Sequence, residues 1–263
     1  MPYPPKSLTI AGSDSGGGAG IQADLKTFAS LGVYGTSAIT AVTSQNTLGV
    51  TDIVNVPTKS VISQIEAVLS DIGTDSIKIG MLSNASIVNA VSSYISQSKF
   101  EKVIVDPVMI SKSGHKLLSE SAIKSMIKML IPISFIITPN IPEASIISET
   151  KINSIESAKI AAKKIVKLGA KACIVKGGHF DGPPIDVFYD GKKYETFKSE
   201  RINTKNTHGT GCTFSAAIAA YIAKGEDIIS AISKSKNYIN SAIQENFLIG
   251  KGYGPLNHFY KQI

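Results

Sequence analysis

Segments with the period of a β-strand and segments with the period of an α-helix alternate along most of this chain. Short apolar runs typical of strands occur at residues 7–11, 36–44, 50–56, 76–80, 103–106, 135–138 and 172–176. Helical spacing is found at residues 21–31, 58–72 (with Thr58 as the expected cap), 84–97, 120–130 and 154–168. A hairpin around residues 190–191 and two final helices complete the expected elements. Because strands joined by helices run parallel in one sheet, the sequence predicts an α/β fold: a mostly parallel sheet with helices on both faces.

Size and composition are consistent with one domain over residues 1–263. The chain has 263 residues and 43% hydrophobic residues, enough for one large core. Its longest apolar runs are short and broken by proline, and its start lacks a signal-peptide pattern, so we expect a cytoplasmic protein without a membrane span. Its two cysteines, Cys173 and Cys212, are not spaced as a metal pair, and Cys173 is expected in a core strand.

The net charge of +7 does not by itself indicate nucleic acid binding. Nearly all positive residues are lysines scattered along helices, and Arg201 is the only arginine. Arginine makes most bidentate contacts to bases, and no basic block is interleaved with aromatic residues. We therefore expect no nucleic acid partner and interpret the excess as solvated helix faces that also attract phosphorylated substrates.

A candidate anion site lies at residues 206–213, which lead directly into the apolar segment 214–223. The first turn of a helix has unpaired N–H groups and a positive dipole end, and glycines such as Gly209 and Gly211 allow an oxygen anion to approach the backbone. Cys212 lies where the dipole would lower its pKa, which predicts a base or nucleophile. The alternative, a tight turn with a small buried cysteine, is equally consistent with this motif alone.

A second glycine-rich loop, residues 12–20, joins an expected strand to an expected helix. This layout is typical of ligand-binding loops. Residues 18–23 fit the dinucleotide fingerprint, but no acidic residue lies between Asp24 and Asp52 to hold a ribose, so a dehydrogenase remains a weak alternative. The loop also lacks the Gly-Lys-Ser/Thr of a P-loop.

Asp24 and Gln45 are candidates for recognising a small heterocycle. Asp24 falls on the apolar face of its own helix, where a carboxylate needs a partner. Gln45 follows the strand at residues 36–44 and should face the same side of a parallel sheet. A carboxylate and an amide together can pair with a ring that carries an exocyclic amine. The alternative for Asp24 is simple compensation of the helix dipole.

Three charged residues follow other expected strands: Asp106, Glu143 and Lys176. The carboxyl ends of parallel strands meet at one edge of a sheet, so these side chains should converge near the anion loop. The two acids suit a hard cation held partly through water, and the lysine suits a phosphate. Each residue also has a purely structural alternative. Asp106 would form a turn before Pro107, Glu143 would be an acid in the first turn of a helix, and Lys176 would be a lysine at the end of a strand. His179 and His208 are interpreted as loop residues.

Together these motifs resemble the hydroxymethylpyrimidine/phosphomethylpyrimidine kinases of thiamine biosynthesis. The resemblance spans nearly the whole chain in order, at residues 12–26, 45–47, 78–82, 106–109, 138–140, 176–179 and 206–212. It implies a ribokinase-like three-layer αβα sandwich with a mostly parallel central sheet. It also implies ATP-dependent phosphorylation of 4-amino-5-hydroxymethyl-2-methylpyrimidine and then of its monophosphate, with ATP and Mg²⁺ as cofactors and a homodimer as the assembly.

The resemblance also implies a role for each candidate residue. In the pyrimidine site, Asp24 and Gln45 would read the ring, and Gly12, Thr43, Met81 and Val108 would form the walls. Asp106 and Glu143 would organise magnesium, while Lys176, Asn140 and Thr210 would hold the nucleotide. Gly209 and Gly211 would stabilise the transferring phosphoryl group, and Cys212 would take the hydroxyl proton or act mainly by shape.

Two alternatives to this function stay open at the level of sequence. Pyridoxal kinases resemble the same family, and some carry the same thiol, although residues 45–47 favour the pyrimidine. Related sugar kinases have an aspartate where Cys212 lies, which leaves the strength of the thiol as a base open. A non-catalytic pyrimidine-binding protein would keep Asp24 and Gln45, but it would not need Asp106, Lys176 and the anion loop together.

Overall fold

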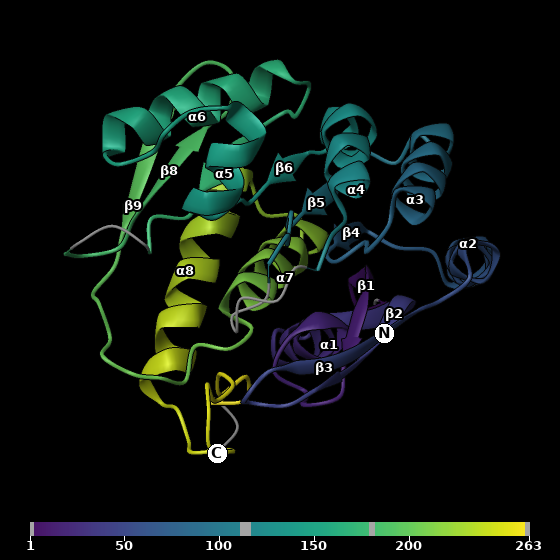
Figure 1. Ribbon diagram of the computed structural model, residues 1–263, viewed down its shortest axis with the longest axis horizontal. Helices are drawn as coiled ribbons and strands as arrows, with labels where there is room; N and C mark the ends of the chain where they lie inside the picture. Colours follow the sequence, from purple (N-terminus) through teal and green to yellow (C-terminus); the bar gives the residue numbers. More distant parts are fainter. Residues whose placement is uncertain (1–2, 111–116, 179–181, 261–263) are drawn as a thin grey trace.

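The described strands of the protein form one sheet in the order β3-β2-β1-β4-β5-β6-β7-β8-β9 (Figure 1). The computed structural model describes residues 3–110, 117–178 and 182–260. The strands are β1 Lys6–Asp14, β2 Tyr34–Gln45, β3 Val50–Asn55, β4 Ser76–Ile79, β5 Val103–Val105, β6 Ile136–Ile137, β7 Cys173–Val175, β8 Ile185–Tyr189 and β9 Tyr194–Lys198. The strands from β2 to β7 in that order pair in parallel, whereas β3, β8 and β9 add antiparallel edges. The predicted mostly parallel sheet is therefore confirmed.

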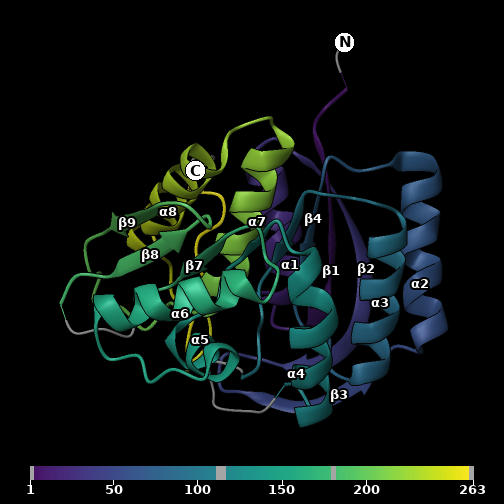
Figure 2. The ribbon, with the colours of Figure 1, turned by 90° about the horizontal axis from the view of Figure 1, so that it is seen from above.

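Helices cover both faces of this sheet (Figure 2). One face carries α2 Thr58–Ala67, α3 Ala85–Gln97, α4 Glu120–Ser125, α5 Ile141–Ser148 and α6 Ile155–Lys167. The other carries α1 Gly20–Ser30, α7 Thr210–Ala223 and α8 Ile228–Gln244. None of the helices in the described part of the chain is long and apolar enough to cross a membrane.

The central strands place alternate residues in two separate cores. Ile77 and Ile79 of β4 belong to the core under α2 to α6, and Lys78 between them points to the opposite face. In β7, Cys173 and Val175 belong to the first core and Ile174 to the second, which confirms Cys173 as a core strand residue. Burial on both faces explains why these strands appear as continuous apolar runs in the sequence.

Two predicted helices extend over the expected residues, but their last turns are π-helical instead of α-helical. The helix expected at residues 58–72 continues from α2 into a π-helical turn at Val68–Ile72, and α4 continues into another at Met126–Leu130. Thr58 is the first helical residue, and Pro57 occupies the cap position without a side-chain hydrogen bond, so the predicted Thr58 cap is wrong. Pro57 has a ψ of 134°, which is extended, so the helical backbone begins only at Thr58.

Candidate functional site

A cavity of about 1060 Å³ opens at the carboxyl edge of the parallel strands. It is lined by residues that follow β1, β2, β4, β5, β6 and β7 and by the start of α7. The structure brings together these sequence-predicted residues in its wall: Gly12, Thr43, Gln45, Met81, Asp106, Val108, Asn140, Glu143, Lys176, Gly209, Thr210, Gly211 and Cys212. The predicted residue that does not line the cavity is Asp24. His179 lies outside the described residues.

The anion loop meets the glycine-rich loop at the start of α7. Gly209 occupies the cap position with φ 82°, and a β-carbon there would lie 1.7 Å from the carbonyl oxygen of Gly18. Only glycine fits such a place, because the left-handed backbone and the close carbonyl both exclude a side chain. A β-carbon on Gly211 would lie 3.1 Å from Nζ of Lys176, so the backbone passes directly beside this cation.

The predicted effect of the helix dipole on Cys212 is not the dominant one. The pKa of the Cys212 thiol is raised to about 11, chiefly by burial; the Lys78 ammonium opposes this rise, and the carboxylates of Asp106 and Asp24 add to it. The expectation of a lowered pKa is therefore wrong for the protein without ligands. Desolvation outweighs the positive end of α7 because it acts on the whole charge of a thiolate.

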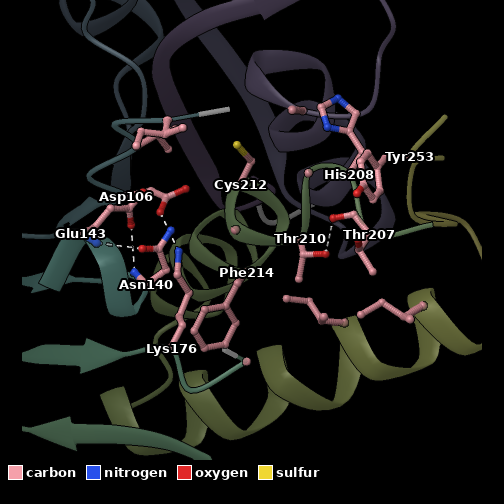
Figure 3. A pocket seen from close by; sticks show the side chains of 18 of the residues that line it. Asp106, Asn140, Glu143, Lys176, Thr207, His208, Thr210, Cys212, Phe214 and Tyr253 are labelled. Atoms are coloured by element: carbon pink, nitrogen blue, oxygen red, sulfur yellow. Dashed lines mark hydrogen bonds and ion pairs between the residues drawn. The ribbon is translucent and has the colours of Figure 1, made fainter. Parts of the chain in front are cut away.

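Asp106 and Lys176 form an ion pair in the wall of the cavity (Figure 3). Nζ of Lys176 lies 2.9 Å from Oδ1 of Asp106, and Asp106 is 1% exposed. Burial lowers the pKa of Lys176, but Asp106 and Glu143 outweigh burial, so the pKa stays above its usual value. Oδ2 of Asp106 is buried and has no hydrogen-bond partner among the described residues. The Oδ2 oxygen of Asp106 is therefore available to accept a hydrogen bond or to bind a cation.

Glu143 combines a helix cap with a position in the cavity wall. Its Oε2 accepts a hydrogen bond from the Asn140 N–H at 2.8 Å, and its own N–H donates to Oδ1 of Asn140 at 2.9 Å, which forms a capping box at the start of α5. Burial raises the pKa of Glu143 to about 7, Lys176 lowers it and Asp106 raises it. Glu143 is thus an acid in the first turn of α5 and also part of the cavity wall.

The carboxylates of Asp106 and Glu143 fit a hard cation only in part. The free Oδ2 of Asp106 and the oxygens of Glu143 are suitable donors for Mg²⁺. No group of three or more His, Cys, Asp or Glu side chains with metal-binding geometry exists in the described ranges. Mg²⁺ usually keeps several waters and uses one or two carboxylates with substrate phosphates, so a pair of acids is consistent with this ion.

The Thr43 and Gln45 side chains form another part of the cavity wall. Oγ1 of Thr43 donates to the Ser13 carbonyl at 2.9 Å and also lies 3.2 Å from Oε1 of Gln45. Nε2 of Gln45 lies 3.3 Å from Nε2 of His208. A β-carbon on Gly12 would come within 3.3 Å of the Met81 sulfur, so glycine lets this thioether close the wall. The amide of Gln45 is thus held with its donor and acceptor atoms at the cavity surface.

Asp14 organises the glycine-rich loop, a role that sequence reasoning missed. Its carboxylate accepts hydrogen bonds from the N–H groups of Gly16, Gly18 and Ala19 at 2.8, 3.1 and 2.8 Å. Nε2 of His208 lies 2.8 Å from Oδ2 of the same carboxylate. Burial raises the pKa of Asp14, but these partners outweigh burial and lower it overall. An aspartate that begins a glycine loop was the available signal, because such residues often bind nearby N–H groups.

Asp24 lies behind the cavity and is paired with Lys78. Nζ of Lys78 lies 2.8 Å from Oδ2 of Asp24, both side chains are 0% exposed, and Oγ1 of Thr9 donates to the same oxygen at 2.6 Å. Burial lowers the pKa of Lys78, but Asp24, Cys212 and Asp106 together outweigh burial and raise it. The expectation that Asp24 contacts the pyrimidine is therefore corrected: the residue that reaches the cavity from this pair is Lys78. The apolar helix face indicated burial, but it could not identify a partner on β4.

A third buried pair, Lys236 and Asp186, supports the turn after Lys176. Nζ of Lys236 on α8 lies 2.5 Å from Oδ2 of Asp186 on β8. Oδ1 of Asp186 accepts the Gly177 N–H at 2.8 Å. Both side chains line the cavity, and α8 adds the apolar residues Ile239 and Ile243. Sequence reasoning missed this pair, since a single aspartate at the start of an apolar strand was its only signal.

The buried pair behind the cavity should be costly to break. The variant Lys78→Met leaves Asp24 buried without its cation, so we expect the free energy of unfolding to fall by about 3–5 kcal/mol. The double variant Asp24→Leu/Lys78→Met should recover most of this loss, because no lone charge remains buried. Urea unfolding measures both. Lys193→Met, which breaks the exposed pair with Glu195, should change stability very little; an equal loss there would contradict this account.

The raised pKa of Glu143 predicts a pH dependence of stability. The folded protein holds a proton on Glu143 up to about pH 7, whereas the unfolded chain releases it near the ordinary glutamate pKa of 4.5. Stability should therefore fall as pH rises through this window. The variant Glu143→Gln keeps an acceptor for Asn140 without this titration, so its stability relative to the original should increase from pH 4.5 to 8, by roughly 2–3 kcal/mol. Denaturant unfolding at several pH values measures the difference, and a constant difference would refute it.

Comparison with known proteins identifies the family. A family model described as phosphomethylpyrimidine kinase matches residues 14–257. A hydroxymethylpyrimidine/phosphomethylpyrimidine kinase of Bacillus subtilis (strain 168) is 48% identical over 256 residues, which cover 97% of this chain and 94% of that protein. The crystal structure of phosphomethylpyrimidine kinase from Clostridium difficile 630 aligns with a TM-score of 0.83 at 46% identity and covers 91% of this chain and 99% of that one.

A pyridoxal kinase has a similar fold. The ADP complex of Bacillus subtilis pyridoxal kinase aligns with a TM-score of 0.92 at 37% identity and covers 99% of this chain and 100% of that one. These likenesses confirm the predicted ribokinase-like α/β fold. With the family match over most of the chain, they also exclude the non-catalytic and dehydrogenase interpretations. The chain therefore belongs to the phosphomethylpyrimidine kinase family and is a kinase.

Proposed function

We propose that this kinase transfers the γ-phosphoryl group of ATP to the hydroxymethyl group of 4-amino-5-hydroxymethyl-2-methylpyrimidine and then phosphorylates the monophosphate, in thiamine biosynthesis. One observation carries the proposal: a single cavity is lined by the Gln45 amide, the Asp106–Lys176 pair and the start of α7. The names of the relatives support the same substrates. One domain over residues 1–263 would carry the activity, because one sheet contains all described strands.

The pyrimidine would bind between Gln45 and the apolar wall. The Gln45 amide offers one donor group and one acceptor, which match a ring nitrogen next to an exocyclic amine. Thr43 orients this amide through its contact with Oε1. Gly12, Met81 and Val108 would enclose the ring as walls. In this proposal Asp24 acts only through Lys78, whose buried ammonium it holds in the lining of the cavity.

The phosphates would bind at the start of α7 and beside Lys176. N–H groups of the first helical turn, at Gly209 and Gly211, suit the oxygens of a transferring phosphoryl group because they are fixed before the reaction begins. The Lys176 ammonium would exchange Asp106 for a phosphate oxygen. Asn140 and Thr210 would contact the nucleotide from the cavity wall. The ADP complex of the pyridoxal kinase neighbour supports a nucleotide in this fold.

Mg²⁺ would be held by Asp106 and Glu143, in part through water. When bound, the ion neutralises charge that builds up on the phosphates during transfer. The protein contributes the free Oδ2 of Asp106, which is already buried and fixed, and the carboxylate of Glu143 at the start of α5. Release of Lys176 from Asp106 would free a second oxygen for this purpose.

Cys212 would accept the proton of the substrate hydroxyl. Its thiol is protonated at neutral pH, because its pKa is raised to about 11 by burial. Only the thiolate can act as a base, so the reactive form is the minor one, and the Lys78 ammonium beside it favours this form. Positioning and electrostatic stabilisation would supply most of the rate, as is usual in phosphoryl transfer.

We also propose a cytoplasmic homodimer that uses the outer part of β2 and β3. Val42 and Val54 are 50% and 59% exposed there, and β3 is the edge strand of the sheet. Exposed apolar side chains on an edge strand are typical of a surface that pairs with another chain.

An ADP-release assay with ATP and magnesium tests the proposed substrates. The pyrimidine, its monophosphate and pyridoxal are compared at equal concentrations, and the products are identified by mass. We expect turnover of both pyrimidines to the diphosphate with a higher kcat/KM than for pyridoxal. Pyridoxal is the second candidate because its kinase in Bacillus subtilis shares the fold so closely. A strong preference for pyridoxal would replace the proposed function.

Two variants separate chemistry from pyrimidine binding. Cys212→Ala should lower kcat by about 100-fold and leave KM for the pyrimidine within a few-fold, because loss of a general base affects the transition state. Gln45→Ala should raise KM by about 10-fold with a smaller change in kcat, since a buried hydrogen bond to the ring is lost. Full turnover by Cys212→Ala would show that the thiol is not the base.

A further inference from the structure

The segment after α8 contacts two loops of the cavity that lie far away in the sequence. We call residues 246–258 the C-terminal strap. Its glycines, Gly250, Gly252 and Gly254, have no role in the proposed chemistry, yet each lies against a polar atom of another loop. Figure 1 shows this yellow segment between the end of α8 and the β2–β3 region. Tyr253 of the strap lines the cavity, on the same side as His208 in Figure 3.

The first contact of the strap is with the turn that follows Gln45. The Tyr253 N–H donates to the Thr47 carbonyl at 2.9 Å, and the Gly252 N–H donates to Oγ1 of Thr47 at 3.2 Å. A β-carbon on Gly252 would lie 2.0 Å from the same carbonyl oxygen. Glycine therefore allows the strap to approach the backbone of the turn, and no change of side chain in the turn could make room for another residue.

The second contact is with the anion loop. The His208 N–H donates to the Gly254 carbonyl at 3.0 Å. Nδ2 of Asn206 donates to Oδ1 of Asn246 at 2.5 Å, near the start of the strap. A β-carbon on Gly254 would lie 2.2 Å from Oδ1 of Asn206. The strap thus holds both the backbone and a side chain of the loop that leads to Gly209 and Cys212.

The far end of the strap is anchored in the core. The Asn257 N–H donates to the Ala242 carbonyl at 3.0 Å, and Oη of Tyr238 donates to the His258 carbonyl at 2.8 Å. Nε2 of His258 lies 2.9 Å from Oγ1 of Thr213, one residue beyond Cys212. These hydrogen bonds hold the strap in a fixed place relative to α7 and α8.

We propose that the C-terminal strap is a positioning element for phosphoryl transfer, which fixes the distance between the acceptor-reading turn after Gln45 and the anion loop before Cys212. Its contacts with the two loops lie within two residues of each other, at Gly252, Tyr253 and Gly254. Two residues of extended chain span about 7 Å at most, so the strap acts as a short spacer. A misplacement of reacting groups by 1 Å can cost about 100-fold in rate.

Glycine variants test this role on each side of the spacer. The details of the substrate rest on the proposed function, so each variant is assayed with the acceptor that the original protein phosphorylates fastest. Gly254→Ala pushes against Asn206 and should lower kcat by about 10-fold or more. Gly252→Ala pushes against the turn and should mainly raise KM for the acceptor, by a similar factor. Gly225→Ala is the matched control, because it strains a left-handed glycine that has no neighbour within 4 Å.

A rescue variant distinguishes positioning from lost stability. Asn206→Ala removes the atoms that Gly254→Ala meets first and leaves only an ordinary contact of 3.5 Å to Cβ. The double variant should therefore recover most of the kcat lost by Gly254→Ala. Melting temperatures are measured for all variants. If Gly254→Ala and Gly252→Ala lower the melting temperature as Gly225→Ala does but leave kcat and KM unchanged, the strap is only structural and the proposal is overturned.

A readout without turnover keeps the result independent of the proposed function. Cys173 is fully buried, so iodoacetamide should alkylate Cys212 preferentially, and mass spectrometry of the product gives the rate. Gly254→Ala should change this rate at least about 3-fold, since the loop that carries the thiol moves, whereas Gly225→Ala should not. If no acceptor is phosphorylated, the function fails, but a changed alkylation rate would still support the strap. An unchanged rate would overturn it.

Discussion

Parallel pairing of the strands from β2 to β7 is the constraint on which the site depends. It brings six strand ends to one edge of the sheet, and the residues that follow them line one cavity. Five of these ends each deliver one kind of group: an amide at the last residue of β2, a thioether after β4, carboxylates after β5 and β6 and an ammonium after β7. No single segment of the sequence contains this site, and the hydrogen bonds between strands are what assemble it.

Three buried lysine–carboxylate pairs surround this cavity: Lys78–Asp24, Lys176–Asp106 and Lys236–Asp186. Without a ligand, each ammonium is neutralised by the protein itself, which limits the cost of burying it. A phosphate that enters must replace an existing partner, so its net gain is a difference between two favourable interactions. Such a site favours ligands with several negative charges, because only these can compensate for every displaced carboxylate.

The sequence predicted those features that depend on local pattern and failed where the partner is distant. The strand ends, the anion loop and most cavity residues could be found, because period and glycine position follow the chain. The Lys78 partner of Asp24 could not, since a helical face indicates burial but not which strand lies beneath it. The predicted lowering of the Cys212 pKa was wrong for a related reason: the dipole is a local effect, whereas desolvation depends on what the fold places around the thiol. The roles of Asp14 and the C-terminal strap depend on contacts between loops that no spacing rule connects.

The contacts between the strap and the turn after Gln45 also order events during synthesis. Gly252 and Thr47 are 205 residues apart in the chain. At about 5–20 residues per second, translation needs roughly 10–40 s to pass from one to the other. During this time β1, β2 and the glycine-rich loop already exist but lack the segment against which they close. The turn after Gln45 can therefore reach its final position only after residue 252 has been synthesised, so this side of the cavity is completed late.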